Sequence, residues 1–431
     1  MQLAGVVQTL LSPIDGTVRE MRYHMSQPYF SPNYLTREEY VKLPLEKRLI
    51  PLSKTEDERA KGLQEKLLKI DLHCHGVIEF PYTHLPTLPF SPPIPKGAPI
   101  FLDKKIPDSL PKEVADFLFA LRQYPLETYV KYYKIHWEGL KEAGVTGVQL
   151  MVSAAVEDFL KTLYLLGFCF AEIQKNPLGK IALRAEDIRA AKREGKIAFM
   201  AASEANPFAN VLDRVTMLYG LGLRQAGMTF EQGNYSGSGA SDARNAGLSN
   251  WGIQIVDKMN ELGMIIDLSH TGKSTTMDTI KRSRDPVALS HNGASGVYPK
   301  GRRCRDDEVL KALAEKGGVI GITAVPNALS NEKRQGIKNW FDHAKYCVDL
   351  IGADHVVVGL DNTWEDHVGF HKMYFGTPDS ELPSYYMEGI ESPTEAFHNI
   401  IRIFVAEGYS DQEIEKIVGA NALSFIEKVV G

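Results

Sequence analysis

Short apolar segments alternate with amphipathic segments along most of the chain, starting near residue 66. Brief apolar runs bounded by polar residues are typical of buried strands, whereas apolar residues three or four positions apart predict helices. Eight strands are predicted, at 69–73, 145–152, 197–204, 225–230, 264–270, 287–291, 318–323 and 355–361. Helices are predicted between them, at 133–143, 186–194, 210–221, 251–262, 273–282, 306–316 and 338–351.

This order of elements predicts an α/β fold. A strand followed by a helix, repeated along the chain, indicates parallel strands joined by crossover helices. Eight such units suggest a (β/α)8 TIM barrel, and an open doubly wound sheet is the alternative. The sequence has no Gly-x-Gly-x-x-Gly segment that opens a helix, which disfavours a dinucleotide-binding sheet.

Two segments depart from the alternation. Residues 1–65 are predicted to form an N-terminal appendage, with short extended pieces within 5–23 and partly helical structure over 37–68. Residues 66–431 would then form the barrel domain. Within it, residues 76–132 separate the first two predicted strands and hold ten of the 23 prolines. We expect this insertion to lie over the barrel mouth as a lid or pocket wall.

Composition narrows the function classes. The 431 residues are 44% hydrophobic and 24% charged, as in an ordinary globular protein, and the net charge of −5 gives no general attraction to nucleic acid or anionic membranes. Four scattered cysteines predict no disulfide framework and fit a reducing compartment. No apolar run reaches the roughly 18 residues that a membrane-spanning helix needs, and no signal peptide is recognisable. We therefore expect a cytoplasmic location and no membrane span.

Residues that can ligate metals gather at the carboxyl ends of the predicted strands. Alone, each has an ordinary structural explanation, such as a core histidine, a helix cap or a buried ion pair. Together they are hard to place in a core, because buried charges are costly unless they are paired or bound to metal. The strand ends of a barrel meet at one mouth, and imidazoles and carboxylates ligate zinc, iron and manganese. The predicted metal-site residues are His73, His75, Glu204, His270, His291 and Asp361.

These motifs resemble those of the renal (membrane) dipeptidase family of metallopeptidases, within the amidohydrolase superfamily. The resemblance runs from about residue 70 to residue 426 and leaves residues 1–65 outside. It rests on Ile-Asp-Leu-His at 70–73, Glu204, Gly-Leu-Ser-Asn-Trp-Gly at 247–252, Ile-Asp-Leu-Ser-His at 266–270, Leu-Ser-His-Asn at 289–292, Arg302 and Arg303, Gly-Leu-Asp at 359–361 and Gly-Ala-Asn-Ala-Leu at 419–423.

The resemblance implies a (β/α)8 barrel with two zinc ions, and a homodimer. It implies that His73 ligates the first metal and that Glu204 bridges both metals. His270 and His291 would ligate the second metal, and Asp361 would handle the proton of the nucleophilic water. Arg303 would hold a substrate carboxylate, although it could also be a solvated cation beside Arg302.

Two positions depart from the family pattern. His75 stands where the family has an aspartate. Its imidazole can still ligate a metal, and manganese and iron are alternatives to zinc as the bound metal. Phe230 aligns with a histidine that is thought to polarise the scissile carbonyl, so the substrate pocket is changed. These departures place ordinary dipeptidase activity in question.

The leading hypothesis is a binuclear metal-dependent hydrolase. It would cleave the amide bond of a dipeptide or a small carboxylated amide, by attack of a hydroxide that bridges the metals. The alternative within the superfamily is an enzyme acting on a non-peptide amide, a cyclic amide, a lactone or a deamination substrate. A metal-binding scaffold without catalysis is a third possibility, which the retention of Asp361 disfavours.

Overall fold

Eight parallel strands close into a barrel in the computed structural model, which describes residues 37–75, 77–78, 133–152, 158–361 and 386–431. β1 pairs with β4 on one side and with β13 on the other, and the pairing of β8 with β9 closes the ring. In ring order the strands are β1 (Ile70–Cys74), β4 (Gly147–Met151), β6 (Ile197–Ser203), β7 (Leu223–Gly227), β8 (Ile265–Asp267), β9 (Ala288–Ala294), β11 (Val319–Ile322) and β13 (Val356–Val358). All eight predicted strands and the (β/α)8 barrel are confirmed.

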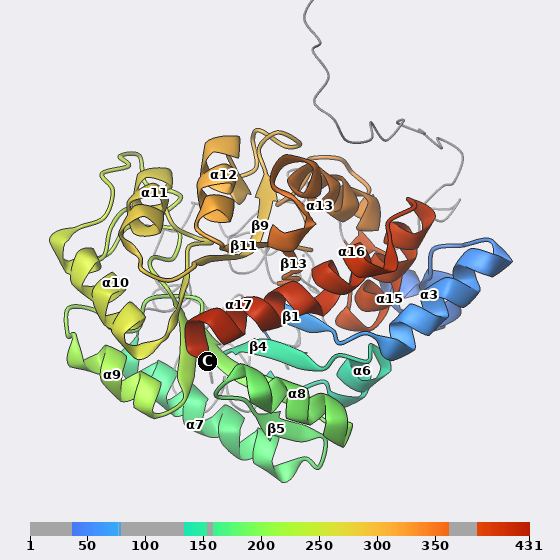
Figure 1. Ribbon diagram of the computed structural model, residues 1–431, viewed down its shortest axis with the longest axis horizontal. Coiled ribbons are helices and arrows are strands. Elements are labelled where there is room, and N and C mark those ends of the chain that lie inside the picture. The colour runs from blue at the N-terminus through green and yellow to red at the C-terminus, as the bar shows by residue number, and fades with distance from the viewer. Residues whose placement is uncertain (1–36, 76, 79–132, 153–157, 362–385) are drawn as a thin grey trace, which may run out of the picture.

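Helices surround the barrel (Figure 1). Those within or close to predicted ranges are α6 (Trp137–Glu142), α8 (Ala185–Glu194), α9 (Asp213–Gly220), α10 (Asn250–Leu262), α11 (Lys273–Arg282), α12 (Asp307–Glu315) and α13 (Ile337–Ile351). Further helical segments outside those ranges are α7 (Phe159–Lys175), η1 (Ala353–His355), α15 (Pro393–Ala406), α16 (Asp411–Glu415), the π-helical η3 (Lys416–Ala420) and α17 (Asn421–Val430).

Short strands extend or flank the barrel. β5 (Gly179–Ile181) and β10 (Cys304–Arg305) add parallel pairs to β6 and β9, and β12 (Gln335–Gly336) pairs with β14 (Met387–Glu388). β2 (Val77–Ile78) and β3 (Tyr133–Lys134) pair antiparallel and bring the two ends of the proline-rich insertion together. Residues 79–132 lie outside the described part of the chain, so the lid stays a prediction.

The amino-terminal end of the barrel is closed by α17, which crosses it in Figure 1. Phe425 and Ile426 of this helix are buried in one apolar cluster with Ile70, Val319 and Val357 from the beginnings of three strands. Burial of large apolar side chains is the main stabilising term in such a core. The opposite, carboxyl-terminal end is left for the functional residues.

The segment with α1 (Arg37–Val41), α2 (Leu45–Arg48) and α3 (Lys54–Lys66) packs against α15. Ser53 begins α3 with a capping box, in which its hydroxyl accepts from the backbone N–H of Glu56. Arg402 of α15 donates to Asp57 of α3 at 2.5 Å. The extended pieces predicted within residues 5–23 lie outside the described residues. Among the helices that the structure describes, none combines the length and apolar character needed to cross a membrane.

Candidate metal centre

The six predicted metal-site residues lie together at the carboxyl-terminal mouth of the barrel. His73 and His291 belong to β1 and β9, and the other four follow the ends of β1, β6, β8 and β13. Among the described residues, possible ligand atoms within 4.8 Å of one another form three groups, of which one joins His73, Asp267 and His291 and the other two share Glu204. Of the two that share Glu204, the first group is His73, His75, Glu204 and Asp361, and the second is Glu204, His270 and His291.

The first group is built around two imidazole nitrogens of β1. Nε2 of His73 lies 3.2 Å from Nε2 of His75. Oδ1 of Asp361 lies 2.9 Å from Nε2 of His75 and 3.4 Å from Nε2 of His73. Oε2 of Glu204 completes the group at 3.8 Å from Nε2 of His75. The Nε2 atoms of the two histidines and the carboxylates of Asp361 and Glu204 therefore surround one position, which a metal ion could occupy.

The second group uses the other oxygen of Glu204. Oε1 of Glu204 lies 2.7 Å from Nε2 of His270 and 3.6 Å from Nε2 of His291. The two imidazole nitrogens are 3.1 Å apart. Oε2 faces His75, whereas Oε1 faces His270 and His291 and also lies 3.9 Å from Nε2 of His73. Glu204 therefore stands between the two groups, where a bridging carboxylate would stand.

Ser290 determines the proton positions of two histidines. Its Oγ donates to Asp267, and it lies 2.7 Å from Nδ1 of His291 and 3.2 Å from Nδ1 of His73. Because the hydroxyl hydrogen is used on Asp267, Oγ accepts from both Nδ1–H groups. The Nε2 lone pairs of His73 and His291 are then free to ligate a metal.

Asp267 supports the site without joining it as a ligand. One oxygen accepts from the backbone N–H groups of Ser269 and Ser290 at 3.1 and 3.0 Å and from Oγ of Ser269 at 2.7 Å. The other accepts from Ser290 and, at 3.2 Å, from Nε2 of Gln225. Both oxygens are thus occupied by protein donors, so this carboxylate anchors Ser290 and the ends of β8 and β9.

His270 is oriented by a carboxylate that the sequence analysis missed. Oε1 of Glu231 lies 3.0 Å from Nδ1 of His270, so Nδ1 donates to it and Nε2 is left for a metal. Glu231 itself has a positive φ of 56° and also accepts from Ser241. The only signal in the sequence was a carboxylate directly after the predicted strand that ends at residue 230.

Asp361 enters the site through an unusual backbone conformation. Its φ is 57°, in the left-handed region that a residue with a Cβ rarely adopts. Its N–H donates to the carbonyl of His73 at 3.0 Å, while Asp71 accepts from the N–H groups of His73 and Leu360. These bonds join the ends of β1 and β13 and hold Asp361 against His75.

The buried charges stabilise one another. Burial raises the pKa of Glu204, but the charge and hydrogen bond of His270, with His75 and His73, outweigh it and hold that pKa at about 2. Burial likewise opposes the ionisation of Asp361, and His73 and His75 nevertheless hold its pKa well below the usual range. Burial lowers the pKa of His73 to about 4. Both carboxylates are therefore ionised and His73 is neutral at neutral pH, the states that metal ligation requires.

The donor set fits divalent metal ions. Ligand atoms about 2.0–2.1 Å from one tetrahedral zinc ion lie roughly 3.3 Å apart. The nitrogen pairs His73–His75 and His270–His291 are separated by 3.2 and 3.1 Å, close to the spacing of two ligands on one zinc ion. Imidazole nitrogens and carboxylate oxygens suit zinc, manganese and iron alike.

Two predicted substrate residues border the cluster. Nε of Arg303 lies 3.4 Å from Oε1 of Glu231, and its Nη1 is buried without a hydrogen-bond partner among the described residues. Its carbonyl accepts from Asn292 and Gly293 of β9, which fixes the backbone beside the mouth. The ring of Phe230 lies over that of His270, with centroids 4.1 Å apart and planes inclined by 30°.

Comparison with known proteins places this barrel in a family. The family described as membrane dipeptidase, peptidase family M19, matches residues 138–430. Dipeptidase tcpJ of Claviceps purpurea is 28% identical over 254 residues, which cover 58% of this chain and 55% of that protein. The chain spans about half the length of the curated relatives it matches.

Solved structures share the fold of this chain. An amidohydrolase from Pseudomonas aeruginosa is 26% identical, with a TM-score of 0.63, and the match covers 68% of this chain and 92% of that one. The probable dipeptidase PvdM from the same organism shares the fold at 17% identity, with a TM-score of 0.65 over 88% of this chain and 99% of that one. The chain belongs to the membrane dipeptidase family, peptidase family M19.

Proposed function

We propose that this protein is a metal-dependent hydrolase that cleaves the amide bond of a dipeptide or of a small carboxylated amide. The observation that carries the proposal is the buried double group of ligands that share Glu204. Membership of a dipeptidase family and a relative named as a dipeptidase support the same chemistry.

We propose two divalent ions, zinc in the first instance, with manganese and iron as alternatives. His73 and His75 would hold one ion, His270 and His291 the other, and Glu204 would serve both. When bound, such ions acidify a water molecule and polarise a carbonyl, which is the chemistry that amide hydrolysis needs.

Asp361 is proposed to move the proton. It is ionised at neutral pH, and its oxygens face both histidine pairs, with Oδ1 2.9 Å from His75 and Oδ2 3.8 Å from His291. A carboxylate in this place can take a proton from the attacking water and deliver it to the leaving nitrogen. Its constrained backbone keeps the carboxylate aimed at the site, so little reorganisation is needed during the reaction.

Arg303 is proposed to orient the substrate. A guanidinium forms two parallel hydrogen bonds with a carboxylate, which fixes the position of the neighbouring amide. The buried Nη1 of Arg303, which lacks a partner among the described residues, is a donor still available for that contact.

Phe230 favours a second candidate function. Its ring covers one face of His270 and offers no hydrogen bond to a developing oxyanion. A non-peptide amide, a cyclic amide, a lactone or a deamination substrate would suit an apolar wall beside the metals. The alternative is therefore an amidohydrolase-type enzyme that acts on one of these four substrate classes.

A substrate panel on the metal-loaded protein tests the proposal. It should contain dipeptides, N-acyl amino acids, neutral amides, cyclic amides, lactones and aminopurines. Turnover of dipeptides or N-acyl amino acids supports the leading proposal, and turnover confined to cyclic or non-peptide substrates supports the alternative. Metal binding without turnover of any of them would contradict both.

A further inference from the structure

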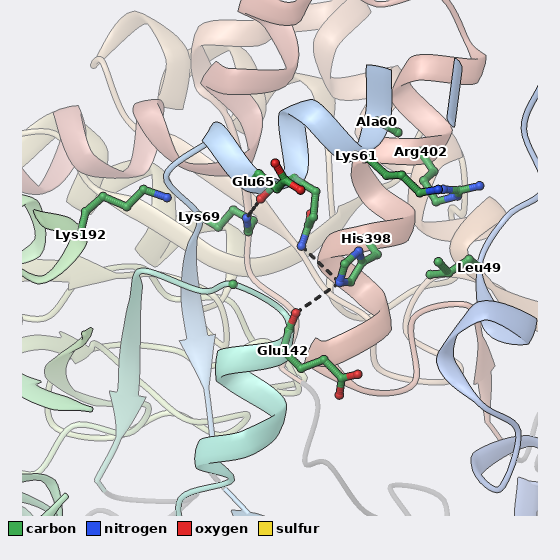
Figure 2. Close-up of a pocket in the computed structure, with 11 residues that line it drawn as sticks. Leu49, Ala60, Lys61, Glu65, Lys69, Glu142, Lys192, His398 and Arg402 are labelled. Carbon is green, nitrogen blue, oxygen red and sulfur yellow. Dashed lines mark hydrogen bonds between the residues drawn. The ribbon is translucent and has the colours of Figure 1, made fainter. Parts of the chain in front are cut away.

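A cavity of about 430 Å³ lies at the amino-terminal end of the barrel, away from the metal centre (Figure 2). It is bordered by α3, α6, α8 and α15 and by the residue that precedes β1. β1 (Ile70–Cys74) begins beside this cavity and carries His73 near its other end, so the same strand reaches both places. Pockets of this volume are typical of sites for small molecules.

Lys69 is the most deeply buried charged group of the cavity. Its side chain is 1% exposed, and its Nζ donates to the carbonyl of Gln64 and lies against Gly144. Burial and the neighbouring Lys192 lower the pKa of Lys69 to about 7, and no carboxylate is among the groups that act on it. An ammonium in such a place is destabilised until an anion accompanies it.

Lys192 supplies a second amine to the same space. Figure 2 shows its side chain reaching from α8 towards Lys69. Its Nζ donates to the carbonyl of Leu67 at 3.0 Å, and no carboxylate pairs with it within the described chain. The other cations of the cavity differ, because Lys61 and Arg402 both bind Asp57 of α3.

Gln64 leaves a hydrogen-bond acceptor unused. Its Nε2 donates to the carbonyl of Ala143 at 2.8 Å, which fixes the orientation of the amide. Its Oε1 is buried and has no partner among the described residues. A buried carbonyl oxygen normally accepts a hydrogen bond, so a donor is missing here.

We propose that this cavity binds a small oxyanion that also carries a hydroxyl group. Its negative oxygens would lie between Lys69 and Lys192, and its hydroxyl would donate to Oε1 of Gln64. Hydrogen phosphate and small hydroxy acids share this chemistry. Such a ligand supplies at once the counter-ion that both amines lack and the donor that the amide lacks. The proposal is independent of the reaction at the metal centre.

Calorimetric titration of the metal-loaded protein tests the proposal, in a chloride buffer at constant ionic strength. The probes are inorganic phosphate and glycolate, which carry a hydroxyl group, and sulfate and acetate, which at neutral pH do not. We expect saturable binding of phosphate or glycolate, and weaker binding of sulfate and acetate. Whether phosphate or glycolate binds more tightly distinguishes the two sources of ligand.

Lys69→Met should weaken the binding about tenfold or more, since a hydrogen bond to a charged group is lost. Lys192→Met should also weaken the binding. Because the side chain of Lys192 is exposed, this variant can be measured instead if Lys69→Met does not fold. Lys180→Met, which removes a surface partner of Glu194, is the matched control and should bind as the wild type does. Absent binding, or binding unchanged in both cavity variants, would overturn the proposal. Equal affinity for sulfate and phosphate would overturn the role of Gln64.

Discussion

Oε1 of Glu231 lies 3.4 Å from Nε of Arg303, so the arginine proposed for the substrate carboxylate already faces a carboxylate of the protein. The same oxygen lies 3.0 Å from Nδ1 of His270. Burial disfavours the charge of Glu231, yet His270, Arg303 and Ser241 hold its pKa well below the usual range. Glu231 therefore connects the proposed metal ligand His270 with Arg303, the residue proposed to bind the substrate.

Glu231→Gln should weaken metal binding. The amide cannot accept from Nδ1 of His270 as strongly as a carboxylate does, so the imidazole becomes a poorer and less well oriented ligand. Loss of such a supporting contact lowers metal affinity by about 10–100-fold. Competition with a chromogenic chelator measures the change. Arg302→Met is the control, because Arg302 contacts Oε2 of Glu231 and Oγ of Ser241 but not the Oε1 that faces His270. Equal losses of metal affinity in the two variants would contradict this role of Glu231.

Arg303→Met should raise KM mainly for substrates with a carboxylate. The charge-assisted hydrogen bond contributes on the order of 1.5–3 kcal/mol, which corresponds to roughly 10–150-fold in KM. Steady-state kinetics on an N-acyl amino acid and on its neutral amide analogue separate this effect from general damage. The same increase for both substrates would show that Arg303 does not contact the carboxylate.

Asp361→Asn should reduce kcat while most of the metal stays bound. Asparagine keeps the size of the side chain and tolerates the left-handed backbone, but it cannot accept a proton from water. Loss of general acid–base catalysis costs about 10²–10⁴-fold in rate. Parallel measurements of kcat and metal content test this point, and a rate near that of the wild type would exclude the proton role.

Metal affinity should increase as the pH rises through the raised pKa of His75. Burial lowers the pKa of His75, but the hydrogen bond that its Nε2–H donates to Asp361 and the charges of Glu204 and Asp361 outweigh it and raise the pKa above its ordinary value. A metal must displace this proton, so binding is weakened below the raised pKa and recovers above it. Chelator competition at several pH values should show a steeper dependence in the wild type than in His75→Ala. Parallel curves would mean that His75 does not bind the metal.

The barrel could be predicted because parallel strands buried on both faces appear as short apolar runs. The ends of the strands could be predicted less accurately. The sequence predicts one strand over 264–270, whereas β8 covers only Ile265–Asp267. The chain turns after Asp267, and this turn presents His270 to the site. Helix α7 escaped prediction, since apolar residues occupy most of its positions and leave no clear polar face.

The gathering of the proposed ligands could be predicted because the carboxyl ends of all barrel strands meet at one mouth. The supporting residues could not, since their roles depend on contacts between loops that no local pattern encodes. Ser290 lies next to His291 in sequence, yet its importance comes from Asp267 and His73 on other strands. Glu231 likewise acquires its role only when the loop after β7 meets His270 and Arg303.

The central claim is a binuclear centre that includes His75. Elemental analysis of protein purified without added metal, with wild type and His75→Ala side by side, tests it most directly. We expect about two divalent ions per chain in the wild type and a fall towards one in the variant. One ion or none in the wild type, even after zinc or manganese is supplied, would contradict it.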